Sequence, residues 1–195
     1  MKVFENEDQF HKKLNKNTKK INPSKEQVLS KAFQFHTQGN IAEAAKYYQY
    51  LIIQGVRDQR VFSNYGLILK GLGKLKEAEI TTRKAIELNP NYALGHSNLG
   101  GILNSLGKFK EAELSIRKAL ELNPEYSNAH YNLGNILRDS KKLSEAATSF
   151  KKALKFQPNF FEAHRDLGIC LYLLKDIDSA VKCIAKANHF DKKNR

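Results

Sequence analysis

Apolar and small residues along this chain recur with a single period of 34 residues. Residues 73–100 and 107–134 are identical at eighteen of 28 positions at this offset, and several differences exchange one aliphatic side chain for another. Pro90, Pro124 and Pro158 have the same spacing. A fixed period of this length is typical of stacked repeats, in which each unit buries its apolar face only against its neighbours.

Counting these prolines as position 32 places five repeats at 25–58, 59–92, 93–126, 127–160 and 161–194. Small residues occupy position 8 (Ala32, Gly66, Gly100, Gly134, Gly168) and position 20 (Ala44, Ala78, Ala112, Ala146, Ala180). Large apolar residues occupy position 11 (Phe35, Leu69, Leu103, Leu137, Leu171) and position 17 (Ile41, Leu75, Phe109, Leu143, Ile177). Each repeat is therefore predicted to form two antiparallel helices, A and B, with close backbones at the small positions and large side chains filling the space between them.

Local signals predict where these helices begin and end. Ser24 and Gln27 can form a capping box at the first helix, and Asn40 can cap the second. The prolines stop the B helices of the second, third and fourth repeats. The turns between A and B helices contain Gly39, Gly73, Gly107, Lys141 and Lys175.

Several residues of this pattern resemble the tetratricopeptide repeat over residues 25–194. They are Leu-Gly at positions 7 and 8, Ala at 20, a large residue such as Ile116 or Phe150 at 24, Ala at 27 and Pro at 32. Two departures are that the first repeat lacks Leu-Gly and Pro, and that the Trp usual at position 4 is replaced by Val28, Phe62, His96, His130 and His164. The resemblance implies an all-α, right-handed α-solenoid of five helix-turn-helix repeats that acts as a protein-interaction scaffold.

Composition favours a cytoplasmic protein with a basic N-terminal extension. Residues 1–24 are rich in Lys and Asn and are expected to be disordered or frayed. The chain has no long apolar run for a membrane span and no signal-peptide core. The formal net charge is +13, but 26 of the 33 basic residues are lysines, and many alternate with glutamate on the B helices. This alternation is typical of a solvated outer face and disfavours nucleic-acid binding.

Catalytic, metal and cofactor sites are not expected. His96, His130 and His164 lie on successive A helices, which pack about 8–10 Å apart. They are too far apart to share a zinc ion, whose ligands lie at about 2 Å. Cys170 and Cys183 lack metal-binding spacing and are interpreted as buried free thiols. No nucleophile with its base, and no phosphate-binding loop, stands apart from the repeat pattern, so the chain is predicted not to be an enzyme.

The resemblance also implies a concave groove lined by the A helices, on the side of positions 2, 5, 6, 9, 12 and 13. Position 6 carries Asn64, Asn98 and Asn132, a predicted asparagine ladder similar to that of the tetratricopeptide domain of O-linked N-acetylglucosamine transferase. Carboxamides can pair with a peptide main chain regardless of its side chains. The groove is expected to contain in addition Asp166, Asn104, Asn128, Tyr131, Asn135, Arg60, Lys70, Arg138 and Arg165.

Five other interpretations arise from the sequence. The asparagines can hydrogen-bond locally instead of binding a ligand. The chain can be the docking domain of a larger glycosyltransferase or sulfotransferase, or self-associate through the open last repeat. RNA binding of the pentatricopeptide kind is disfavoured because that repeat has another period and residue pattern. The carboxylate-clamp subfamily of tetratricopeptide domains, which grips C-terminal Glu-Glu-Val-Asp tails of heat-shock proteins with basic and Asn residues, is disfavoured as well, because Asp166 stands where a cation is needed.

Overall fold

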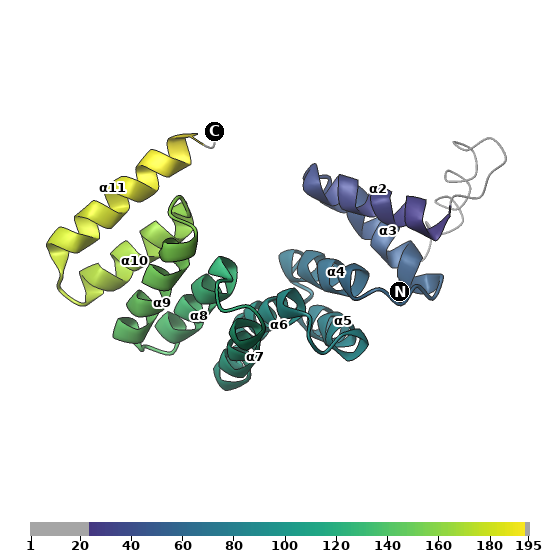
Figure 1. The fold of residues 1–195 in the computed structure, drawn as a ribbon, viewed down its shortest axis with the longest axis horizontal. Coiled ribbons are helices and arrows are strands. Elements are labelled where there is room, and N and C mark those ends of the chain that lie inside the picture. Colours follow the sequence, from purple (N-terminus) through teal and green to yellow (C-terminus); the bar gives the residue numbers. More distant parts are fainter. Residues whose placement is uncertain (1–23, 194–195) are drawn as a thin grey trace. The chain divides into compact units, whose positions relative to one another are not determined.

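The computed structural model describes residues 24–193, which form ten helices in five hairpins and contain no strand (Figure 1). The chain divides into two compact units, residues 1–57 and 58–195. The first unit contains α2 (Lys25–Thr37) and α3 (Ile41–Ile53). The second contains α4 (Gln59–Gly71), α5 (Leu75–Leu88), α6 (Ala93–Ser105), α7 (Phe109–Leu122), α8 (Ser127–Asp139), α9 (Leu143–Phe156), α10 (Phe161–Leu173) and α11 (Ile177–Lys193). The expectation of disorder before Ser24 falls outside the described residues.

The predicted caps of the first hairpin are confirmed. Ser24 Oγ accepts a hydrogen bond from the backbone N–H of Gln27 at 3.2 Å, and Gln27 Oε1 accepts one from the Ser24 N–H at 2.9 Å. Asn40 Oδ1 accepts from the Glu43 N–H at 3.3 Å at the start of α3. These contacts satisfy amide groups that have no partner within the helix.

Each hairpin turn contains one residue in the left-handed region. Gly73 has φ 74° and Gly107 has φ 73°, as glycine tolerates without a steric cost. The equivalent residues of the last two hairpins are Lys141 (φ 66°) and Lys175 (φ 69°), for which this conformation is strained. The turn geometry is thus kept even where the sequence lacks glycine.

The small residues at position 8 allow the two helices of a hairpin to approach closely. A Cβ added to Gly100 would lie 2.5 Å from Ile116, and one added to Gly134 would lie 2.5 Å from Phe150. Both neighbours occupy position 24 of the B helix and have no exposed surface. The space that glycine leaves is therefore filled by the side chain at position 24.

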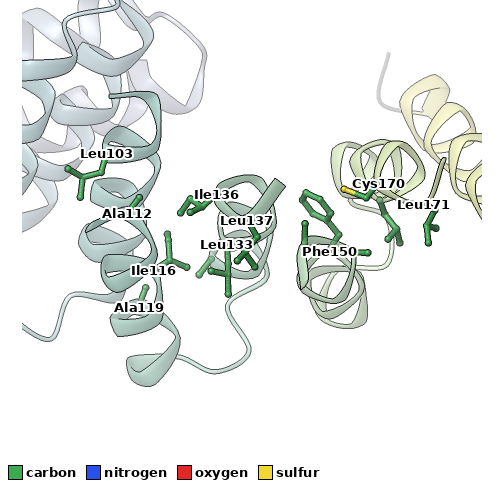
Figure 2. Packing of buried hydrophobic residues seen from close by; sticks show 14 of the residues in the cluster. Leu103, Ala112, Ile116, Ala119, Leu133, Ile136, Leu137, Phe150, Cys170 and Leu171 are labelled. Atoms are coloured by element: carbon green, nitrogen blue, oxygen red, sulfur yellow. The ribbon is translucent and has the colours of Figure 1, made fainter. Parts of the chain in front are cut away.

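Within the second unit, successive hairpins share a continuous core. Helix α4 contacts α6, α6 contacts α8, and each of α5, α7 and α9 packs against the A helix that follows it. Figure 2 shows part of this core, where Leu103 and Ile116 belong to one hairpin and Leu137 and Phe150 to the next. The second unit is an α-solenoid, a stack of helical hairpins.

One expectation about the core is wrong at some of its positions: Leu143 of position 17 packs against the core, whereas others are exposed. The repeat pattern predicts buried apolar residues at position 17, but Phe109 is 37% exposed and Ile177 is 47% exposed. Position 17 is the first residue of each B helix, so its side chain lies at the edge of the hairpin. No helix among the described residues is long and apolar enough to span a membrane.

Candidate functional site

A row of hydrogen bonds joins successive A helices of the second unit. Asn98 Nδ2 donates to Ser63 Oγ at 3.0 Å, and Asn132 Nδ2 donates to Ser97 Oγ at 3.1 Å. Tyr131 Oη donates to Asp166 Oδ2 at 2.8 Å. Each pair joins position 5 of one repeat to position 6 of the next, with a sequence separation of 35 residues. We call these three pairs the polar ladder.

The position-5 residues of the polar ladder correct a prediction. The repeat register predicts that position 5 faces the groove, yet Ser63 is 0% exposed and Ser97 is 1% exposed. Their hydroxyls lie between neighbouring A helices, where the amide of the next repeat satisfies them. A hydrogen bond of this kind contributes about 0.5–1.5 kcal/mol to stability, so the asparagine at position 6 has a structural role. Sequence reasoning missed these serines as partners of the asparagines.

The polar ladder nevertheless leaves part of each asparagine available. Asn98 and Asn132 are half-buried, and each uses one N–H for its serine. The described residues provide no hydrogen-bond donor for the Oδ1 atom of either side chain, and the second amide N–H is also unused among them. Each carboxamide can therefore still offer one acceptor and one donor to a ligand.

The remaining predicted site residues lie on the four A helices of the second unit. Asn64 is half-buried on α4, Asn128 is exposed on α8, and Asn135 is half-buried one turn after Asn132. Asn104 Nδ2 donates to Asp139 Oδ2 of the next A helix at 2.8 Å. The Oδ1 atoms of Asn104 and Asn135 are buried without a donor among the described residues.

A buried carboxylate stands at the end of the polar ladder. Asp166 is 3% exposed and accepts from Tyr131. Two cations also reach it: Arg165 Nε lies 3.0 Å from Oδ1, and Arg138 Nη1 lies 3.4 Å from Oδ2. The hydrogen bond to Asp166 raises the pKa of Arg165, while burial is the main cause of a raised pKa for Tyr131. The carboxylate of Asp166 therefore has ion-pair and hydrogen-bond partners within the fold, as a buried charge requires.

The two other predicted cations, Arg60 and Lys70, lie on α4. Arg60 Nη2 lies 2.7 Å from Asp58 Oδ2, and this contact with Arg60 lowers the pKa of the Asp58 carboxyl. Lys70 is half-buried, and desolvation lowers its pKa. No carboxylate or hydrogen-bond acceptor among the described residues contacts its ammonium.

The three histidines have a recurring structural contact. The Nε2 atoms of His96, His130 and His164 lie 2.8, 2.9 and 2.9 Å from the carbonyl oxygens of Pro90, Pro124 and Pro158. A carbonyl only accepts, so Nε2 carries the proton and donates. The contact ties each A helix to the proline that ends the preceding repeat. Among the described residues, no group of three possible metal ligands occurs.

The outer face of the B helices carries paired charges. Glu79 binds Arg83 of its own helix at 2.8 Å and Lys108 of the next repeat at 3.0 Å. Glu113 pairs with Arg117 at 2.7 Å. Lys76 and Lys110 are exposed on the same helices. Such exposed pairs contribute little to stability, about 0–1 kcal/mol each.

The chain repeats a helical hairpin of constant length, with a small residue where the A and B helices of a hairpin pack closely and polar contacts between equivalent A helices. These features define a helical-repeat protein of the α-solenoid class. Family models described as Tetratricopeptide repeat match residues 59–92, 93–126 and 116–148, and one described as TPR repeat matches residues 134–175. The chain belongs to the tetratricopeptide repeat family.

Solved structures of similar fold agree with this assignment. The thermophilic TPR protein TTC0263 of Thermus thermophilus has a TM-score of 0.77 at 19% identity, covering 87% of this chain and 93% of that one. PilF of Pseudomonas aeruginosa has a TM-score of 0.74 at 20% identity, covering 85% of this chain and 76% of that one. MamA of Desulfovibrio magneticus has a TM-score of 0.69 at 20% identity, covering 87% of this chain and 96% of that one. At these identities the similarity concerns the fold. No curated protein matches the chain.

Proposed function

We propose that the second unit binds an extended peptide segment of a protein partner along its A helices. The tetratricopeptide family supports a protein-interaction scaffold. The observation that carries the finer proposal is the equivalent placement of Asn98 and Asn132, each fixed by a buried serine and each retaining an Oδ1 atom that no described residue uses. An extended peptide presents main-chain N–H groups at a regular spacing, whatever its side chains are.

The anchoring of the amides favours binding. A free asparagine side chain would have to be ordered when a ligand arrives, at a cost of up to about 1 kcal/mol. The hydrogen bond to serine fixes the amide before binding. Because Ser63 and Ser97 are buried, they offer no surface to the ligand themselves.

This difference gives a matched experiment. Asn98→Ala combined with Asn132→Ala removes the ligand-facing amides and the internal bonds together. Ser63→Ala combined with Ser97→Ala removes these internal bonds, together with the contacts of the serines with Tyr92 and Tyr126, but leaves the ligand-facing amides in place. Partners would be captured from the native source with the intact protein, and the affinity of one purified partner then measured by calorimetry for both variants.

The asparagine variant is expected to bind about tenfold more weakly, since two hydrogen bonds contribute about 0.5–1.5 kcal/mol each. The serine variant is expected to lose clearly less. Equal losses in the two variants would show that the asparagines act only in the fold. Lys76→Glu with Lys110→Glu tests the outer face: if this variant alone loses affinity, an acidic or nucleic-acid partner on that face replaces the proposal.

The last hairpin favours a second candidate, self-association. Among its residues, Tyr172 is 62% exposed, Val181 63% and Leu173 50%, and they line a surface hollow of about 530 Å³. Ala147, the equivalent of Val181 one repeat earlier, is only 5% exposed. This apolar face of α10 and α11 suits a second copy of the chain, because a two-fold contact would bury the same apolar residues on both sides.

Sedimentation velocity tests this candidate. A concentration-dependent dimer that disappears in Tyr172→Lys combined with Val181→Lys is expected. A monomer at all accessible concentrations would exclude it and would leave the peptide-binding proposal unaffected.

A further inference from the structure

Lys70 differs from the other three cations expected along the A helices. Arg60 pairs with Asp58, Arg165 pairs with Asp166, and Arg138 pairs with both Asp139 and Asp166. Lys70 has no ion-pair or hydrogen-bond partner in the described part of the chain. Within that part, the A-helix face therefore has one cation whose charge the fold does not balance.

The surroundings of Lys70 make an unbalanced charge costly. The side chain is half-buried on α4, and burial lowers the pKa of its ammonium. An exposed lysine would keep its hydration, whereas a desolvated ammonium is stabilised chiefly by an anion beside it. Lysines of the outer B helices, such as Lys76, are exposed and do not carry this cost.

Gly101 on α6 lies directly beside this ammonium. A Cβ at Gly101 would lie 3.3 Å from Lys70 Nζ and 3.9 Å from Asn132 Nδ2, with no other described atom within 4 Å outside its own helix. Its neighbour Gly100 is needed for helix packing against Ile116, but Gly101 is not. Glycine inside a helix costs about 0.5–1 kcal/mol relative to alanine, so its presence is unfavourable for the helix alone.

Two hydrogen-bond donors thus converge on the space above Gly101. Lys70 Nζ and Asn132 Nδ2 both lie within 4 Å of the same point. One N–H of Asn132 is used by Ser97, and no described residue uses the other. No acidic residue between Ser24 and Lys193 forms an ion pair with this ammonium.

We propose that Lys70, Gly101 and Asn132 form a subsite that binds a carboxylate of the peptide segment. This inference rests on the proposed peptide-binding function and names one chemical feature of its ligand. The two oxygens of a carboxylate can accept from the ammonium and from the amide, and hydrogen bonds to a charged acceptor are stronger than neutral ones. A singly charged group matches the single unbalanced cation, because the nearby arginines are already paired.

The carboxylate can belong to an Asp or Glu side chain or to the C-terminus of the partner. Two libraries of random acetylated decapeptides distinguish these sources, one with amidated and one with free C-termini. Each is passed over the immobilised full chain, and bound peptides are sequenced by mass spectrometry. Enrichment of Glu and Asp over Gln and Asn in the amidated library identifies a side chain, and preferential retention of the free library identifies a C-terminus.

Lys70→Met is expected to reduce the acidic preference about tenfold while neutral peptides still bind. Gly101→Ala should weaken it in the same direction, because the methyl group occupies the space beside the ammonium. Lys76→Met on the outer face is the matched control and should leave the preference unchanged. Retention of peptides by the wild type without any acidic preference would overturn the subsite and leave the peptide-binding function standing.

A direct titration covers the case in which no peptide is retained and the proposed function fails. The pKa of Lys70 is followed by NMR of its side-chain Hε and Cε nuclei, with and without glutarate as a carboxylate probe. A bound carboxylate raises the pKa of an ammonium. A higher pKa of Lys70 in glutarate, absent in Gly101→Ala, supports the subsite, and an unchanged pKa overturns it.

Discussion

Gly134→Ala tests the close contact between α8 and α9. The added Cβ would lie 2.5 Å from Cε1, 2.6 Å from Cδ1 and 2.8 Å from Cζ of Phe150. Carbon atoms in ordinary contact lie about 3.5–4.0 Å apart, so the ring must move by roughly 1 Å. Phe150 has no exposed surface, and its ring packs against Tyr131 with centroids 5.7 Å apart. The ring cannot move without disturbing its neighbours.

The expected net effect is a loss of about 1–2 kcal/mol in the free energy of unfolding. Overpacking a well-filled core costs about 1–3 kcal/mol. Alanine offsets part of this, because replacing glycine inside a helix gains about 0.5–1 kcal/mol. Urea denaturation followed by circular dichroism measures the difference as a lower midpoint at an unchanged slope. Since repeat arrays can unfold in parts, hydrogen exchange of α8 and α9 should show the same loss locally.

Gly101→Ala is the matched control in a neighbouring A helix. Its Cβ would meet only the flexible end of Lys70 at 3.3 Å, so this variant should be as stable as the wild type or up to about 1 kcal/mol more stable. Adding Phe150→Leu to Gly134→Ala should recover part of the loss, because the ring atoms that clash are removed. If Gly134→Ala is as stable as the wild type, or Gly101→Ala is as damaging, the proposed hairpin packing is incorrect.

Three further predictions concern the turns, a histidine and the polar ladder. Lys141→Gly and Lys175→Gly should each raise the urea midpoint, by roughly 1 kcal/mol in stability, because both lysines adopt a left-handed conformation; unchanged midpoints would contradict this strain. Burial lowers the pKa of His130 in the folded state, so below about pH 6.5 the unfolded state binds more protons than the folded state. The contribution of His130 to stability should therefore fall as the pH decreases from there towards the folded-state pKa. Thermal melts of the wild type and His130→Phe over a pH series measure this fall, and parallel profiles of the two proteins would refute it. Ser97→Ala and Asn132→Ala should show a coupling of about 0.5–1.5 kcal/mol in a double-mutant cycle of urea midpoints; additive effects would mean that the hydrogen bond contributes nothing.

The sequence determines the fold class through regularity more than through any single residue. A period of 34 residues, glycine or alanine at position 8 and alanine at position 20 are sufficient to predict helix pairs in register. The caps at Ser24 and Asn40 are predictable because their partners lie three residues away in the chain. Local signals of this kind depend on few neighbours and are therefore visible without a structure.

The polar contacts between repeats are not visible in the same way. The bond from Asn98 to Ser63 crosses 35 residues, and its existence depends on the rotation of one A helix against the next. A serine at position 5 is compatible with either a groove-facing or a buried side chain, and the repeat register alone places it on the groove side. Arg60, Arg138 and Arg165 pair with carboxylates, and Lys70 has no such partner among the described residues. This difference also depends on side-chain positions, which the repeat pattern of the sequence does not contain.

The ladder amides and Lys70 would contribute to recognition in different ways. Amides that bind a main chain add affinity without regard to sequence, whereas one ammonium adds a preference for a single acidic residue. These contributions differ in their dependence on salt. The net charge of +13 attracts acidic partners at long range, but exposed charges are screened beyond about 8 Å at physiological ionic strength. Lys70 is half-buried and would contact its carboxylate directly, so an acidic preference that persists at high salt would arise from this subsite and not from the lysines of the outer face.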